Sequence, residues 1–84
     1  MKSLSNMLNL HIAQVNTVLF DGEVESVTLP GSDGELTVLG QHEPLITTLK
    51  EGTITVRPHG SSEQTFSITR GILEVSDNKA VVLV

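Results

Sequence analysis

Short runs of aliphatic and β-branched residues, interrupted by Gly, Pro and Asp-Gly steps, are the feature that most restricts the fold of this chain. The runs recur at a spacing of roughly 8–12 residues, which is typical of sandwiches and barrels. No window of about 11 residues has the periodicity of an amphipathic helix. We therefore predict an all-β fold, a small antiparallel β-sandwich of about 8–10 short strands.

Alternation between apolar and polar residues places these strands. Leu8, Leu10 and Ile12 fall on one face of the first run, with polar residues between them. Residues 45–49 fit a single helical turn as well as a strand. The expected strands cover residues 8–13, 18–20, 23–29, 36–39, 45–49, 52–57, 64–69, 71–75 and 79–84. We expect a single β-sandwich domain over residues 8–84, preceded by a flexible tail over residues 1–7.

Turn signals divide the first half of the chain. Asp21-Gly22 predicts a turn before the strand at 23–29, because Asp-Gly is a favoured hairpin step. Pro30-Gly31 and Asp33-Gly34 predict the next break. The last run, residues 80–84, is apolar on both faces. It lies either in a central strand that is covered on both sides or in a strand whose outer face meets another chain.

Composition excludes several classes of function. The chain has 84 residues, a formal charge of −5, no Cys, and only Phe20 and Phe66 as aromatic residues. A core of Leu, Ile and Val is therefore expected, without disulfides or thiolate metal sites. The negative charge argues against nucleic acid and against an anionic membrane surface as partners. Neither a spanning segment nor a secretory signal is evident, so we expect a cytosol-facing domain that does not insert into the membrane.

Candidate catalytic groups lack partners. The three histidines are far apart, and His42-Glu43 is not followed by a second His at the spacing of a zinc protease. Ser32 has no credible His and Asp partners and fits a turn better than a nucleophile. Glu23 and Glu25 share a strand face, but two solvated charges explain them more simply. We therefore expect no catalytic, metal or cofactor site, and we do not expect an enzyme.

Four motifs carry a resemblance to a known family. They are Phe-x-Gly-Glu-Val-Glu-x-Val-x-x-Pro-Gly from Phe20, Gly-Glu-Leu-x-Val-Leu from Gly34, Gly-x-His-x-Pro-Leu-x-Thr-x-Leu-x-x-Gly from Gly40, and Gly-x-Leu-Glu-Val from Gly71. In this order they resemble the N-terminal β-sandwich domain of the epsilon chain of F-type ATP synthases. The resemblance covers nearly the whole chain from about Leu8 onward.

The resemblance implies a non-catalytic rotor subunit. Such a subunit packs on the gamma chain and on the membrane c-ring, and it helps to couple proton translocation to ATP synthesis. It implies a peripheral location at the cytoplasmic face of the inner membrane of a bacterium, without a cofactor. We expect the isolated domain to be monomeric or weakly self-associating.

The resemblance also assigns two contact loops. Ser32, Asp33, Gly34 and Glu35 match the loop that lies against the ring, with Glu35 at the tip of the turn; a solubilising charge at a turn is the plain alternative. Gln41, His42 and Glu43 match a loop that family members place near the gamma chain; an ordinary Gly- and Pro-bounded turn is the alternative there.

The resemblance leaves alternatives for the regulatory role and for the function of the chain. Full-length family members continue into a C-terminal helical hairpin with regulatory functions, which these 84 residues do not contain. If Val84 is the natural end, we expect the regulatory function to be absent. If the chain is a trimmed piece, the parent protein can still have that function. The other function that we considered is a stand-alone β-sandwich module that binds a protein or peptide at an exposed strand edge. A sugar-binding module is disfavoured because the chain has no Trp and no Tyr.

Overall fold

The computed structural model describes residues 7–84 and confirms the all-β prediction. Of the predicted tail over residues 1–7, all but Met7 lies outside the described residues. The strands are β1 (Leu8–Gln14), β2 (Thr17–Gly31), β3 (Gly34–Leu39), β4 (Leu45–Leu49), β5 (Gly52–Pro58), β6 (Gln64–Ile68), β7 (Gly71–Ser76) and β8 (Lys79–Leu83). The segment at 45–49 is thus a strand and not a helical turn.

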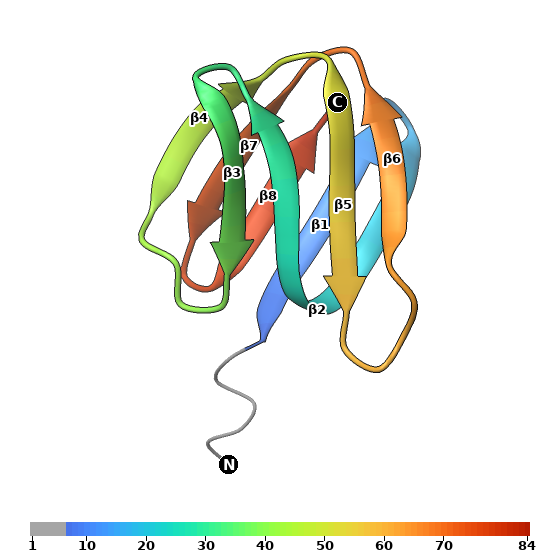
Figure 1. Cartoon of the computed structure of the whole chain (residues 1–84), viewed down its shortest axis with the longest axis vertical. Coiled ribbons are helices and arrows are strands. Elements are labelled where there is room, and N and C mark those ends of the chain that lie inside the picture. Colours follow the sequence, from blue (N-terminus) through green and yellow to red (C-terminus); the bar gives the residue numbers. More distant parts are fainter. Residues whose placement is uncertain (1–6) are drawn as a thin grey trace.

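The strands form two layers that share β2 (Figure 1). One layer holds β1, β8, β7 and β4, and the other holds β3, the second half of β2, β5 and β6. The hydrogen-bonded order is β1-β8-β7-β4-β2-β5-β6, with β3 on β2 and with a further pairing between β1 and β2. Because β2 pairs in both layers, the sandwich is one continuous sheet folded on itself.

The predicted turn at Asp21-Gly22 is wrong, because both residues lie inside β2. They pair with His11 and Leu10 of β1, respectively. The chain changes layer further on, where the register between β2 and β5 shifts between Val24 and Ser26. An extra residue in one strand bends it sharply, so β2 crosses between layers without breaking. The predicted runs at 18–20 and 23–29 are therefore parts of a single strand of 15 residues.

The prediction of a purely antiparallel sheet is also wrong, because one pair of strands is parallel. β1 runs parallel to β8, with Leu10 opposite Ala80 and Ile12 opposite Val82. All other pairings of the described strands are antiparallel. Parallel strands need a long connection, and here six strands separate the two partners in sequence. Turn signals act locally, so they could not have revealed this pairing.

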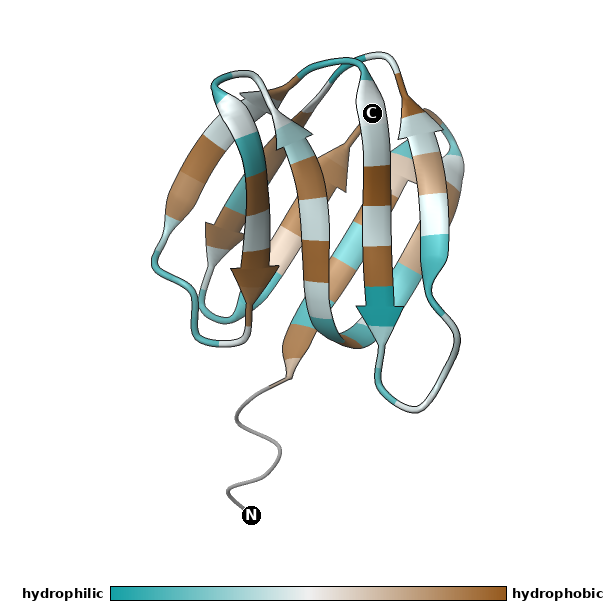
Figure 2. Ribbon diagram, in the orientation of Figure 1, coloured by the Kyte–Doolittle hydropathy of each residue, from teal (hydrophilic) through white to brown (hydrophobic). Residues whose placement is uncertain are grey.

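The core lies between the layers and consists of aliphatic residues. Brown and pale bands alternate along β2 and β5 in Figure 2, since successive side chains point to opposite faces. Phe20 and Phe66 only pack against the margin of the core. The buried hydrophobic residues are Leu8, Leu10, Ile12, Val24, Val27, Leu29, Val38, Leu49, Ile54, Val56, Ile68, Leu73, Val75, Ala80 and Val82.

Candidate partner-binding surfaces

The loop predicted to contact the ring is a tight hairpin between β2 and β3. Gly31 and Gly34 close it as a pair, and Ser32 and Asp33 form the turn. The Ser32 backbone N–H donates to the Thr48 carbonyl (3.0 Å), and the two hydroxyls lie 2.7 Å apart. A Cβ at Gly31 would come within 2.6 Å of the Gly34 carbonyl oxygen, so the turn needs glycine there.

Glu35 does not lie at the tip of this turn, where we had placed it. It is the second residue of β3 and pairs with Pro30. The tip belongs to Ser32 and Asp33, because Gly34 (φ 136°) already pairs with Gly31. The residues predicted for the ring contact, 32–35, are nevertheless all exposed.

The loop predicted to contact the gamma chain is tied to the turn between β7 and β8. The backbone N–H of Gln41 (φ 67°) donates to the Asn78 side-chain oxygen at 2.9 Å. The Asn78 amide in turn donates to the Met7 carbonyl at 2.7 Å. Half-buried His42 places its Nδ1 2.8 Å from the Glu43 carbonyl oxygen. The loop is thereby fixed to the beginning of β1.

The two predicted contact loops lie at opposite ends of β3 (Figure 1). Residues 32–35 stand at the end with the chain terminus Val84, and residues 41–43 stand at the other end. The 6 residues of β3 span roughly 20 Å at about 3.3 Å per residue. One partner contacting both loops would therefore have to cover the whole length of the sandwich.

Sequence analysis identified only part of a third surface, the outer side of β4, β7, β8 and β1. We call this side the apolar face. Ile72 pairs with Leu83, Leu83 with Ala13, and Ala13 with Val18, so these residues form a continuous line across β7, β8, β1 and β2. Ile72, Leu83 and Val18 are 49%, 55% and 57% exposed. We call this line the apolar row.

The character of the apolar face changes along its strands. The neighbouring line towards the Gln41–Glu43 loop holds Ile46, Glu74, Val81, His11 and Asp21. His11 Nδ1 lies 3.5 Å from a carboxylate oxygen of Asp21. The line after that contains Ser76, Lys79, Asn9 and Glu23. The face is therefore apolar near Val84 and charged near Asn78.

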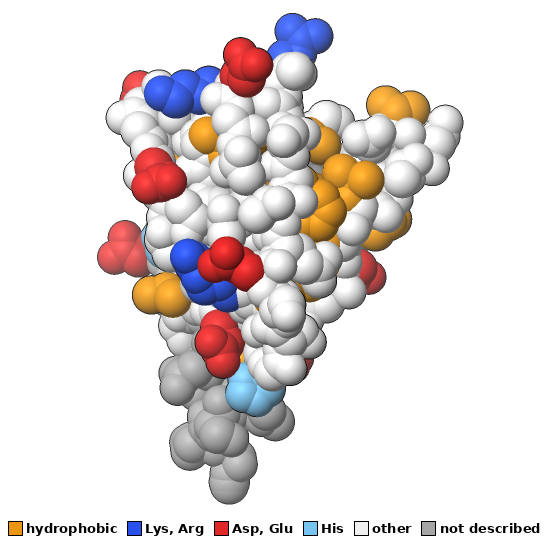
Figure 3. Space-filling view, turned by 45° about the vertical axis from the view of Figure 1, so that its right-hand side comes forward, with side chains coloured by type: hydrophobic (Ala, Val, Ile, Leu, Met, Phe, Trp, Pro, Cys, Tyr) orange, Lys and Arg blue, Asp and Glu red, His pale blue; other side chains and the backbone are white. Residues whose placement is uncertain are grey.

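The outer side of β3, β2, β5 and β6 has a different composition, and we call it the threonine face. Thr37, Thr28, Thr55 and Thr65 form one cross-strand line. The hydroxyls of Thr28 and Thr37 lie 2.9 Å apart, and Arg57 pairs with Glu63 at 3.1 Å. Figure 3, which brings the side of β6 forward, shows scattered charges and hydrophobic side chains gathered along one margin.

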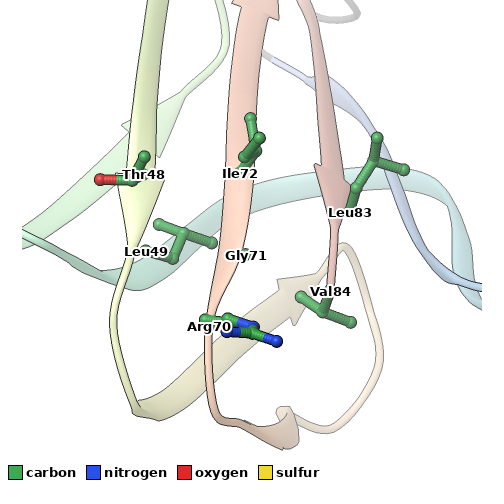
Figure 4. A pocket seen from close by; sticks show the side chains of 7 residues that line it. All are labelled: Thr48, Leu49, Arg70, Gly71, Ile72, Leu83 and Val84. Atoms are coloured by element: carbon green, nitrogen blue, oxygen red, sulfur yellow. The ribbon is translucent and has the colours of Figure 1, made fainter.

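A pocket of about 410 Å³ opens where the apolar row meets the end of the core (Figure 4). Exposed Ile72 and Leu83 form one part of its wall, and Arg70 and Val84 lie at its other end. Arg70 and Val84 also line a second, smaller pocket beside the β1–β2 turn. The lining of the first, which we call the end pocket, is Thr48, Leu49, Arg70, Gly71, Ile72, Leu83 and Val84.

Two kinds of site considered for the sequence, a metal site and a nucleophilic serine, have no counterpart among residues 7–84. No group of three His, Cys, Asp or Glu side chains in this range is placed to hold a metal ion. Ser32 has a hydroxyl neighbour in Thr48 and no histidine hydrogen bond. No helix in the described part of the chain has the length and apolar character needed to cross a membrane.

Comparison with solved structures supports the fold. A chain of the Euglena gracilis mitochondrial ATP synthase OSCP/F1/c-ring structure matches with a TM-score of 0.85 at 22% identity, over 92% of this chain and 49% of that one. A chain of the Tetrahymena thermophila mitochondrial ATP synthase central stalk/c-ring structure matches with a TM-score of 0.76 at 14% identity, over 90% and 61%.

Sequence relatives are closer. The ATP synthase epsilon chain of Sulfurimonas denitrificans is 43% identical over 77 residues, which is 92% of this chain but only 59% of that protein. The epsilon chain of Chlorobaculum tepidum is 40% identical over 83 residues, 99% of this chain and 94% of that protein. The family model described as "ATP synthase, Delta/Epsilon chain, beta-sandwich domain" matches residues 7–84. The chain thus belongs to the family of ATP synthase epsilon chains, of which it represents the β-sandwich domain.

Proposed function

We propose that this chain is a non-catalytic rotor subunit in the central stalk of an F-type ATP synthase, which packs on the gamma chain and on the c-ring. Membership of the epsilon chain family over residues 7–84 is the observation that carries this proposal. A folded surface without chemistry of its own suits such a role, because a rotor element works through rigid packing. In this way the subunit helps to couple proton translocation to ATP synthesis.

The gamma chain is the proposed partner of the apolar face. Exposed apolar patches that adjoin polar margins are typical of protein–protein interfaces, and the apolar row has this arrangement. The loop of Gln41, His42 and Glu43 borders the charged end of the same face through its bond to Asn78. A gamma chain lying along the strands would contact both the loop and the row.

The c-ring is the proposed partner of the hairpin end. Ser32, Asp33, Gly34 and Glu35 are exposed there, with polar and acidic side chains. Such a tip suits contact with polar loops of a membrane protein rather than with its apolar part. We therefore propose a peripheral location at the cytoplasmic face of a bacterial inner membrane, without insertion into the membrane.

Co-purification tests the proposal. The chain is co-expressed with the gamma chain of the same organism and applied to a size-exclusion column at micromolar concentration. We expect the two to elute together, and an unrelated β-sandwich of similar net charge serves as the control. Separate elution would remove the main support for a rotor subunit and would favour the stand-alone binding module instead.

A further inference from the structure

The end pocket combines apolar walls with one cation, Arg70, that forms no ion pair within residues 7–84. The ion pairs found among residues 7–84 join His11 to Asp21, Arg57 to Glu63 and His59 to Glu25, so none of them involves Arg70. Arg70 is exposed and belongs to the linings of both neighbouring pockets. Its charge is therefore available to a group that comes from outside the described chain.

We propose that the end pocket is the anchor point for the gamma chain: it takes one large apolar side chain of gamma, and a carboxylate of the same gamma segment pairs with Arg70. This inference rests on the proposed function and adds the chemistry that the partner must present. Aliphatic walls select an apolar side chain, and the guanidinium selects a planar anion that it can bind through two parallel hydrogen bonds.

The walls of the pocket make the Arg70 contact stronger than an ordinary surface ion pair. Covering Ile72 and Leu83 with a partner side chain removes water from the surroundings of the guanidinium. Charge-assisted hydrogen bonds gain strength when water is excluded, and Arg is enriched among the residues that dominate binding energy. An exposed ion pair elsewhere on the surface contributes little by comparison.

The shape of the pocket depends on a glycine. A Cβ at Gly71 would lie 2.7 Å from the Leu83 carbonyl oxygen and 2.9 Å from Val84 Cγ1. Glycine thus allows the beginning of β7 to approach the end of β8. Val84 is held in place because its backbone N–H donates to the Ala13 carbonyl at 2.9 Å. The pocket is therefore preformed, which lowers the entropic cost of binding.

A protein segment fits the pocket better than a small molecule does. Leu83 and Ile72 belong both to the pocket lining and to the apolar row, which continues to Ala13 and Val18. Three strand spacings of about 4.8 Å make the apolar row, from β7 to β2, roughly 14 Å long. A ligand confined to the pocket would leave Ala13 and Val18 in water, whereas a protein segment that covers the row can place one side chain in the pocket as well.

Binding of purified gamma chain, measured by titration calorimetry, tests the proposal. We expect R70E to raise the dissociation constant by about 30-fold or more, as removal of an interface hot spot does. Arg70→Lys should give a smaller loss, because it keeps the charge but not the paired hydrogen bonds. Leu83→Ser should weaken binding in the same range as R70E. Lys50→Glu is the matched control: it reverses an exposed cation at the same end of the sandwich, outside the pocket lining.

The outcomes separate this inference from the proposed function. If the wild-type chain binds gamma and R70E binds equally well, or if Lys50→Glu has the same effect as R70E, the anchor is disproved while the rotor function stands. If the wild-type chain does not bind gamma, both fail. Loss of a homodimer in R70E with gamma binding unchanged would assign the pocket to a second copy of the chain and overturn the proposal. Equal melting temperatures of all variants ensure that binding and not folding is compared.

Discussion

On the apolar face, Ile72, Leu83 and Val18 stand in one cross-strand line with about half of each side chain in water. On the threonine face, the corresponding line is made of four threonines. Both faces belong to strands whose inner side chains are buried, and a strand needs only its inner side to be apolar in order to fold. The apolar residues on the outside are therefore not required by the fold, and exposed apolar patches of this kind are typical of surfaces that contact another protein.

The difference is sharpest within single strands. β8 buries Ala80 and Val82 and exposes Leu83, although its sequence is apolar at every position from 80 to 83. β5 buries Ile54 and Val56 and places Thr55 between them on the other side. β5 thus has the pattern of a strand covered on one side. β8 has the pattern of a strand covered on both sides, but residues 7–84 cover only its inner side.

The largest expected effect separates inner from outer residues on β7. Leu73→Ala removes a fully buried side chain, and we expect it to lower the free energy of unfolding by about 2–5 kcal/mol. Ile72→Ala, at a half-exposed neighbouring position, should cost about 1 kcal/mol or less. Urea denaturation of both variants measures the difference. Equal losses in the free energy of unfolding would mean that Ile72 contributes to the core. The apolar face could then not be regarded as a surface free for a partner.

The sequence predicts the composition of the threonine face better than that of the apolar face. Ile54, Thr55 and Val56 alternate between apolar and polar residues, and this pattern alone indicates a strand covered on one side, as β5 is. The continuous apolar run at 80–84 left two alternatives, and the exposure of Leu83 shows that residues 7–84 leave the outer face of β8 uncovered there. The apolar row itself depends on register between strands distant in sequence, such as Ala13 beside Leu83. No local pattern contains that information.

The candidate loops show the same limit. Turn chemistry located the Ser32–Asp33 hairpin within a residue, because Gly31 and Gly34 are needed there. Asp21-Gly22 carries an equally strong turn signal, yet its pairing with β1 keeps it in a strand. The end pocket could not be predicted, since it lies where the end of β4, the beginning of β7 and the end of β8 come together. Tertiary pairing overrides local preference in each of these cases.

The next prediction concerns a double variant that gives the apolar face the composition of the threonine face. In the double variant Ile72→Thr and Leu83→Thr, the apolar row takes on the chemistry of the threonine face, and both positions carry β-branched threonine, which is well suited to a strand. We expect gamma binding to weaken by about 10-fold or more, because the partner no longer buries these two apolar side chains. Calorimetric titration measures it. A matched double variant, Thr55→Val and Thr65→Val, changes the opposite face and should bind as the wild type does; reduced binding there would place gamma on the threonine face.

The smallest effect on stability concerns Glu35, which stands beside the threonine line on the outer side of β3. Glu35→Lys should change the free energy of unfolding by no more than about 0.5 kcal/mol, because the side chain is exposed and takes part in none of the ion pairs of residues 7–84. If residues 32–35 contact the ring, the same substitution should weaken retention of the subunit on membranes that carry the c-ring and leave gamma binding unchanged. Thr37→Lys, two residues along the same face, controls for added charge. A large fall in melting temperature would instead make Glu35 a structural residue, and unaltered retention would show that the ring contacts the sandwich elsewhere than at its hairpin end.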